Sequence, residues 1–305
     1  MSAIAWLSKK LDDGRIICEA CKHECTLKEG EYGICAIRKV ENGVLNLLTY
    51  GLAAAVHINR IEKQPVFHLM PGSRVLSIGT IGCNFSCKFC ENYDFSQYPK
   101  ENDYKIDGRK LSPQEAVDLA LAYECESIAY TYNEPATYFE YCYDTAKLAH
   151  EAGLKNIYAT SGYETAVAID LIAPFVDIMV IDIKSSNDTF YNDLCGASLQ
   201  PVLDTIRYAH SKGIRIEATT PLIPEHNDSD EAIRAIGTFI ADLDPSIPWH
   251  LMPFKPMYKM LNIGQTPAET LRRAYDIGKK TGLHYVYIKN PEAEGCDTAS
   301  CHGCA

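Results

Sequence analysis

Residues 74–90 read RVLSIGTIGCNFSCKFC: an apolar, strand-like run, then a glycine, then three cysteines at C-x3-C-x2-C spacing. Cys83, Cys87 and Cys90 can hold three irons of a [4Fe-4S] cluster, because soft thiolates suit iron–sulfur centres. The spacing leaves the fourth iron without a local ligand, and an open iron can bind a substrate. The alternative is a structural zinc loop with a distant fourth ligand.

The composition is that of an ordinary globular protein. The chain has 305 residues, and its net charge of −11 argues against a nucleic-acid substrate, which needs a basic face. No run of eighteen apolar residues exists and the first ten residues lack a signal-peptide layout, so we expect no membrane span and a cytoplasmic location.

Beyond residue 74, short β-rich runs alternate with helical patterns, which is typical of a parallel α/β sheet or barrel. We expect strands at 74–80, 127–132, 156–160, 177–183, 214–220, 249–252 and 284–288. We expect helices at 113–124, 136–152, 165–173, 201–212, 230–243 and 267–281. Six β/α units predict a partial (β/α)6 barrel, open on one side, with its active site at the C-terminal ends of the strands.

Polar side chains follow four of the predicted strands, where that active site would lie. The candidates are Asn133, Glu134, Ser161, Asp182, Lys184 and His250.

The cysteine loop, with Phe89 before its third cysteine, resembles that of the radical S-adenosylmethionine (SAM) enzymes. The stretch 71–290 is similar to their activating-enzyme branch, typified by the pyruvate formate-lyase activating enzymes, through Glu134, the turn 160–163, Asp182 with Lys184, and His250. A closer resemblance, to the radical SAM members of the AmmeMemoRadiSam system, rests on further segments and extends to the N-terminal cysteines. These segments are 71–80, 132–135, 219–220 with 223–224, and 248–250.

The resemblance implies a [4Fe-4S] cluster on Cys83, Cys87 and Cys90, with SAM bound to the open iron through its amino and carboxylate groups. The resemblance also implies which residues bind SAM. Asn133 and Glu134 would contact its ammonium, and Asp182 and Lys184 its ribose and carboxylate. Phe89, Ser161 and His250 are further cofactor-binding candidates. One electron from a ferredoxin or flavodoxin would start the reaction.

The resemblance favours a protein or peptide substrate, as for the activating enzymes. Two alternatives stay open: a small metabolite as substrate, and a non-catalytic iron–sulfur or zinc protein that acts as scaffold or sensor. The chain departs from the glycyl-radical activases near Thr219, where their fifth strand carries an arginine.

Cysteines also cluster at both ends of the chain. Cys18, Cys21, Cys25 and Cys35 fit a closed zinc site or a fully ligated second iron–sulfur cluster, with free thiols as the alternative. We therefore expect a Cys-rich N-terminal module at 1–70, the barrel at 71–290, and a tail with three cysteines at 291–305.

Overall fold

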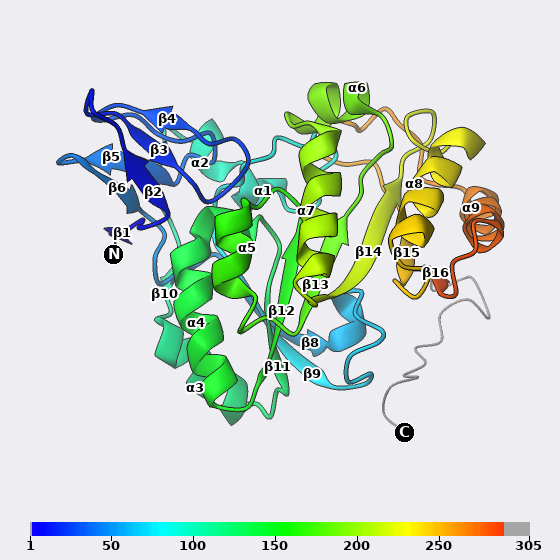
Figure 1. Ribbon diagram of the computed structural model, residues 1–305, viewed down its shortest axis with the longest axis horizontal. Helices are drawn as coiled ribbons and strands as arrows, with labels where there is room; N and C mark the ends of the chain where they lie inside the picture. The colour runs from blue at the N-terminus through cyan, green and yellow to red at the C-terminus, as the bar shows by residue number, and fades with distance from the viewer. Residues whose placement is uncertain (1, 290–305) are drawn as a thin grey trace.

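The computed structural model describes residues 2–289, and its centre is a mostly parallel sheet (Figure 1). Over these residues the sheet has eight strands in the order β16-β15-β14-β13-β12-β11-β9-β8. All neighbours are parallel except β8 and β9, which are antiparallel. The bounds are β8 (Ala55–Arg60), β9 (Arg74–Gly79), β11 (Ser127–Tyr130), β12 (Lys155–Thr160), β13 (Ile178–Asp182), β14 (Arg215–Leu222), β15 (Trp249–Pro253) and β16 (Val286–Ile288).

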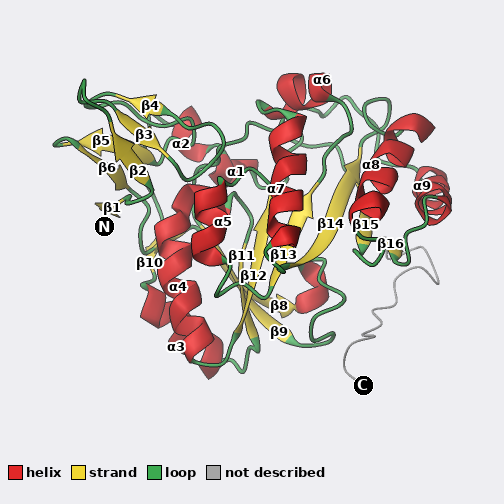
Figure 2. Cartoon of the chain, in the orientation of Figure 1, coloured by secondary structure: helices red, strands yellow, loops and turns green. Residues whose placement is uncertain are grey.

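Helices connect the parallel strands and cover one face of the sheet (Figure 2). The main ones are α3 (Pro113–Ala122), α4 (Phe139–Glu151), α5 (Ala166–Ile172), α7 (Leu199–Ser211), α8 (Asp230–Leu243) and α9 (Ala268–Lys280). Shorter ones are η1 (Ile61–Lys63), α1 (Tyr93–Ser96), α2 (Tyr98–Glu101), η2 (Pro135–Tyr138), α6 (Asp188–Phe190) and the π-helix η3 (Tyr191–Cys195). None of the helices in this part of the chain is long and apolar enough to cross a bilayer.

The sequence explains why these helices begin where they do. Ser112 caps α3 in a capping box with Glu115, and Pro113 occupies the first turn. Ser229 caps α8 by accepting a hydrogen bond from the backbone N–H of Ala232. Trp249 of β15 is fully buried, and its ring lies 3.2 and 3.1 Å from where a Cβ on Gly237 of α8 or Gly278 of α9 would stand, so both helices pack closely on it.

Small antiparallel sheets at the N-terminus pack beside the barrel helices (Figure 1). They comprise β1 (Ala3–Ile4), β2 (Ser8–Lys10), β3 (Ile16–Cys18), β4 (Thr26–Leu27), β5 (Arg38–Glu41) and β6 (Val44–Leu47), while β7 (Leu52–Ala53) pairs with β10 (Arg109–Lys110). Arg38 reaches from β5 to α4, where its Nη2 lies 2.5 Å from Oε2 of Glu140. Both side chains are 1% exposed.

The fold class is confirmed: an α/β chain with a mostly parallel sheet and a Cys-rich N-terminus. Each of the seven expected strands is present, and six β/α units precede β16. The sequence did not predict β8, the antiparallel edge strand. The domain bounds at residues 70 and 290 stay predictions, and the tail with its three cysteines lies outside the described residues.

Candidate functional site

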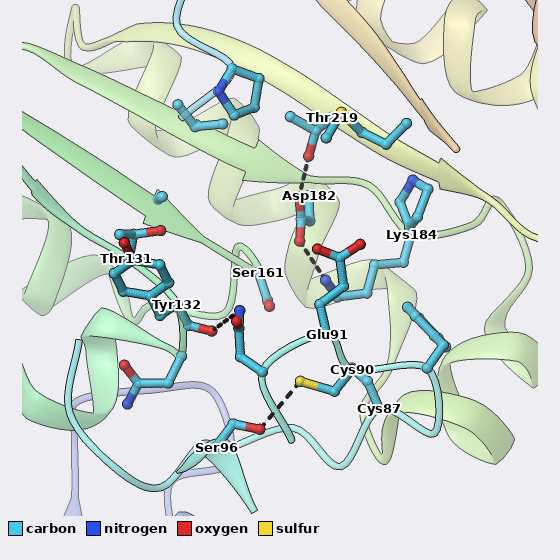
Figure 3. Close-up of a pocket in the computed structure, with 18 of the residues that line it drawn as sticks. Cys87, Cys90, Glu91, Ser96, Thr131, Tyr132, Ser161, Asp182, Lys184 and Thr219 are labelled. Atoms are coloured by element: carbon cyan, nitrogen blue, oxygen red, sulfur yellow. Dashed lines mark hydrogen bonds and ion pairs between the residues drawn. The ribbon is translucent and has the colours of Figure 1, made fainter. Parts of the chain in front are cut away.

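A cavity of about 510 Å³ lies at the C-terminal ends of the parallel strands. Its wall includes the cysteine loop and side chains from seven strand ends or the turns that follow them. Eight of the predicted site residues line it: Cys83, Cys87, Phe89, Cys90, Asn133, Ser161, Asp182 and Lys184. Figure 3 shows Cys90 from the loop side facing the space that Asp182 and Lys184 approach from the strands.

Backbone hydrogen bonds fix the cysteine loop at both ends. The N–H of Gly82 donates to the carbonyl of Phe95, at 2.9 Å. Further along, the N–H of Ser86 donates to Cys195 and that of Lys88 to Leu194, each at 2.8 Å. The loop is therefore fixed against η3, the π-helix.

Two of the three sulfurs, those of Cys83 and Cys90, have polar neighbours that can donate hydrogen bonds to a thiolate. The N–H of Phe85 donates to Sγ of Cys83 at 3.4 Å, and Oγ of Ser96 lies 3.2 Å from Sγ of Cys90. Burial raises the pKa of the Cys83 thiol, and it raises that of Cys90 to about 11. A hydrogen bond with the Cys195 thiol, together with burial, raises the pKa of Cys87 well above its usual value. Protons therefore occupy these buried sulfurs until a cation replaces them.

Lys184 is a buried cation at the cavity wall. Its Nζ lies 2.6 Å from Oδ2 of Asp182, and Oδ1 of Asp182 accepts a hydrogen bond from the Thr219 hydroxyl (Figure 3). Burial disfavours the ammonium of Lys184, but the neighbouring Asp182 carboxylate outweighs it and holds the pKa of Lys184 well above its usual value. Lys184 therefore brings to the cavity a positive charge that a carboxylate orients, and Lys63 and Lys289 also line the wall.

Asn133 holds the loop in front of Cys83. Its Nδ2 donates to the carbonyl of Gly82 at 2.7 Å and to Oγ1 of Thr80 at 3.0 Å, while its Oδ1 accepts from the N–H of Thr80 at 3.2 Å. Both amide hydrogens are thus engaged in positioning this loop.

Glu134 is fully buried and is not among the cavity-lining residues. Its carboxylate accepts hydrogen bonds from the N–H groups of Ser161, at 2.8 Å, and Ala136, at 3.2 Å. The Thr160 hydroxyl lies 2.8 Å from Glu134 and 2.5 Å from Glu164.

A hydroxyl has one hydrogen, so Thr160 cannot donate to two carboxylates at once. Burial and the nearby charge of Glu134 raise the pKa of Glu164 well above its usual value. Glu164 therefore holds the proton. Burial also raises the pKa of Glu134, but the three donors around its carboxylate offset this in part, which makes Glu134 the more acidic of the two. The arrangement fixes the turn that brings Ser161 to the cavity.

His250 is also buried and does not line the cavity. Its Nε2 lies 2.6 Å from Oε2 of Glu217, and the same carboxylate accepts from the N–H groups of Phe67 and His68. This places His250 in a network that ties β14 and β15 to the segment after η1. The cofactor roles predicted for Glu134 and His250 stay predictions.

Several residues near the site were not predicted from sequence. Ser96 lies beside Cys90, Glu164 carries the shared proton, and Cys195, expected to be an isolated buried residue, lies beside Cys87. Tyr132 belongs to the segment 132–135 on which the family resemblance rests, but its φ of 73° was not expected and is unusual for a side chain of its size; its hydroxyl lies 3.0 Å from Nδ1 of His57. The sequence does not indicate that a non-glycine residue at a strand end adopts a positive φ. Nor does an isolated cysteine in helical sequence indicate which side chain it will contact in the folded protein.

Comparison with known proteins identifies the relatives of this chain. Residues 77–236 match the family model of the radical SAM superfamily. The chain is 39% identical over 301 residues to uncharacterized protein MJ0808 of Methanocaldococcus jannaschii. The aligned region covers 98% of this chain and 89% of that protein. It is 20% identical over 231 residues to pyruvate formate-lyase 1-activating enzyme of Escherichia coli strain K12, with 70% of this chain and 91% of that protein covered.

Solved structures share the fold. A radical SAM methyltransferase from Sphaerobacter thermophilus matches with a TM-score of 0.57 at 19% identity, over 72% of this chain and 67% of that one. SuiB of Streptococcus suis, bound to its precursor peptide SuiA, matches with a TM-score of 0.55 at 14% identity, over 71% of this chain and 48% of that one. At these identities the likeness concerns the fold alone.

Proposed function

The chain belongs to the radical SAM superfamily, and on that premise we propose that it binds a [4Fe-4S] cluster and SAM in the strand-end cavity and modifies a protein or peptide by hydrogen abstraction. One observation supports this most directly: Cys83, Cys87 and Cys90 line the same cavity as Asp182 and Lys184. Three possible cluster ligands and the ion pair of Asp182 and Lys184 thus line the same cavity. The family implies the cluster and SAM; their use on this substrate class is our proposal.

The donor set fits an iron–sulfur cluster with one open iron. Cys83, Cys87 and Cys90 are thiols free of disulfides on a loop fixed by backbone hydrogen bonds. The donors at Phe85 and Ser96 favour the thiolate forms of Cys83 and Cys90. When bound, the cluster and SAM supply one-electron cleavage of the sulfonium to methionine and a 5′-deoxyadenosyl radical.

The chain's own residues bind and orient SAM in this proposal. Lys184 supplies the positive charge for the carboxylate of SAM, and Asp182 keeps that ammonium in place while it faces the ribose. Ser161 offers its hydroxyl from the turn held by Glu134. The apolar side chains of Phe89 and Phe254 exclude water from the wall, which protects a reactive primary radical.

The first experiment tests SAM cleavage. The chain is reconstituted anaerobically with iron and sulfide, reduced with dithionite in the presence of SAM, and assayed for 5′-deoxyadenosine. We expect product from the wild type and from Cys125→Ala, a buried cysteine outside the cavity, and none from Cys87→Ala. A reconstituted chain that neither binds SAM nor forms deoxyadenosine would support the scaffold alternative instead.

The second experiment separates the two substrate classes. An anaerobic lysate is divided by ultrafiltration, and each fraction is added to the deoxyadenosine assay. Stimulation by the macromolecular fraction, abolished by prior protease treatment, supports a protein or peptide substrate. Stimulation by the small-molecule filtrate alone contradicts it and favours a metabolite. Replacing dithionite by ferredoxin or flavodoxin tests the proposed electron donors in the same assay.

A further inference from the structure

One side of the cavity carries hydrogen-bond donors that the proposed SAM site does not use. His57 lines it from β8, Lys63 and Gln64 line it from η1 and its end, and Tyr132 lines it from the turn after β11. In the sheet order, three strands separate β8 from β13, the strand that precedes Lys184. Figure 3 shows Tyr132 across the cavity from Lys184. We call His57, Lys63, Gln64 and Tyr132 the β8 wall.

Strand register explains why His57 faces the cavity. His57 pairs with Ser77 of β9, and directly opposed residues of an antiparallel pair place their side chains on the same face of the sheet. The Ser77 hydroxyl accepts a hydrogen bond from Nε2 of Gln64 at 2.8 Å, so this face is the one that η1 covers. A few residues on, the N–H of Phe67 donates to Glu217 of β14 at 3.0 Å. The segment from η1 to Phe67 therefore crosses the cavity face of the sheet.

Tyr132 is held on this wall in an unfavourable backbone conformation. Its φ of 73° costs a bulky residue energy and persists only where the surroundings impose it. Nδ2 of Asn92 donates to the Tyr132 carbonyl at 2.8 Å, and the Tyr132 hydroxyl lies 3.0 Å from Nδ1 of His57. Gly79 leaves room for the side chain, because a Cβ there would lie 2.9 Å from Cβ and 3.0 Å from Cδ2 of Tyr132. Such strain is typical of residues that contact a ligand.

The contact between Tyr132 and His57 leaves a second donor on the wall. A phenol has one hydrogen, and when Tyr132 donates it to Nδ1 of His57, the imidazole hydrogen is assigned to Nε2. The His57 ring is exposed, and so is the side chain of Lys63. The wall therefore offers an imidazole N–H and an ammonium beside a phenol.

The charges of the cavity favour an anion. Asp182 and Lys184 offset one another at 2.6 Å. The other charged side chains among the described lining residues are Lys63, Lys289 and Glu91, so the balance is positive. Nζ of Lys289 donates to the carbonyl of Lys63 at 3.3 Å, which brings the two lysines together. The whole chain carries a net charge of −11, so the cavity reverses the sign of its surroundings and attracts anions locally.

We propose that His57, Lys63 and Tyr132 bind a carboxylate of the substrate and thereby hold it for hydrogen abstraction. The inference rests on the proposed function and narrows its substrate class to a peptide with an acidic side chain or a C-terminal carboxylate near the reacting residue. Lys63 supplies the charge, and the two rings supply neutral donors, a combination that suits the several acceptor positions of a carboxylate. His57, Lys63 and Tyr132 are thus substrate-positioning residues.

Binding of short labelled peptides to the full chain tests the proposal without any assay of activity. The chain is reconstituted with its cluster, supplied with SAM, and titrated at low ionic strength by fluorescence anisotropy. The probes are an N-terminally labelled peptide amide with two glutamates, the same amide with two glutamines, and a labelled tetra-alanine with a free C-terminal carboxylate. We expect an acidic probe to bind about tenfold more tightly than the glutamine probe.

The probes also distinguish the two sources of the carboxylate. Tighter binding of the glutamate amide assigns an acidic side chain, and tighter binding of tetra-alanine assigns a C-terminal carboxylate. Equal binding of all three probes, or binding of none, would overturn the proposal.

Variants locate the binding on the β8 wall. Lys63→Glu should abolish the preference for the acidic probe, and Tyr132→Phe, which keeps the ring and loses the hydroxyl, should weaken its binding by about three- to tenfold. Lys147→Glu makes the same charge change at an exposed position of α4 outside the cavity and should keep the preference. Equal losses in Lys63→Glu and Lys147→Glu would overturn the location. Weaker SAM binding in Tyr132→Phe, with peptide binding unchanged, would assign Tyr132 to SAM and overturn its role.

The deoxyadenosine assay separates binding from chemistry. Lys63→Glu should raise by about tenfold the amount of macromolecular fraction that gives half-maximal stimulation, while the maximal rate stays within about twofold. A lower maximal rate at an unchanged half-maximal amount would contradict the positioning role. A wild type that forms no deoxyadenosine would strike the proposed function, and the peptide titration would still decide whether the wall binds a carboxylate.

Discussion

Replacing Gly82 by alanine should destabilise the chain through two separable effects. An alanine at φ of +81° costs about 1–2 kcal/mol, because its Cβ crowds the following carbonyl. The new Cβ also lies 2.5 Å from Cγ2 of Ile37 and 2.7 Å from the carbonyl oxygen of Cys35, and the carbonyl is backbone that cannot rotate away. Such overpacking typically costs about 1–3 kcal/mol, so the total is about 2–5 kcal/mol.

Gly153 provides a matched control. Its φ is also +81°, but nothing lies within 4 Å of an added Cβ, so Gly153→Ala should show the backbone effect alone. Urea unfolding followed by circular dichroism compares the two variants with the wild type. We expect Gly82→Ala to lose about 1–3 kcal/mol more than Gly153→Ala, and to take up less iron on reconstitution. Equal losses in the two variants would refute the close contact between the cysteine loop and the N-terminal strands.

Three further predictions concern side chains around the cavity. Because burial raises the pKa of Glu164, the folded state holds a proton that the unfolded state releases above about pH 4.5. As pH rises, the wild type should therefore lose stability relative to Glu164→Gln, with the unfolding constant changing by up to tenfold per pH unit. Parallel pH profiles of the two proteins would contradict this. Asp182→Asn removes the charged partner of Lys184, and calorimetry should show SAM affinity weakened by about 10–100-fold. An unchanged affinity would mean that Asp182 and Lys184 do not take part in SAM binding. Cys195→Ala should keep its iron and its deoxyadenosine formation, like the control Cys142→Ala; iron loss in Cys195→Ala alone would mean a fourth cysteine ligand.

The sequence predicted the barrel well because its signals are local. The strand runs, the capping box at Ser112 and the glycine before the cysteine loop act through neighbouring residues, and the structure reproduces the elements within a few positions. The antiparallel strand β8 escaped prediction because its pairing with β9 depends on a contact between distant segments. The N-terminal strands escaped it for a second reason: they are two to four residues long, too short to show a period.

The candidate site was predictable in its location but less so in its contacts. Residues at strand ends alternate between faces, and no pattern in one sequence says which face meets the cavity. Asp182 lines the cavity, whereas His250 turns to Glu217. Asn133 was expected at the ammonium of SAM, yet its amide is bonded to the loop before Cys83, a choice that depends on where that loop lies in space.

The ion pair between Arg38 and Glu140 makes the N-terminal strands and the barrel one folding unit. Removing the Arg38 side chain alone would leave the buried Glu140 carboxylate without its cation, a loss of about 3–5 kcal/mol. If the two parts were separated, the N–H of Leu7 and the carbonyl of Thr137 would lose partners at the same seam. We therefore expect one cooperative melting transition, and a barrel expressed without residues 1–70 should be insoluble. A cysteine-rich segment that looks like an appendage in the sequence is thus a structural requirement of the barrel.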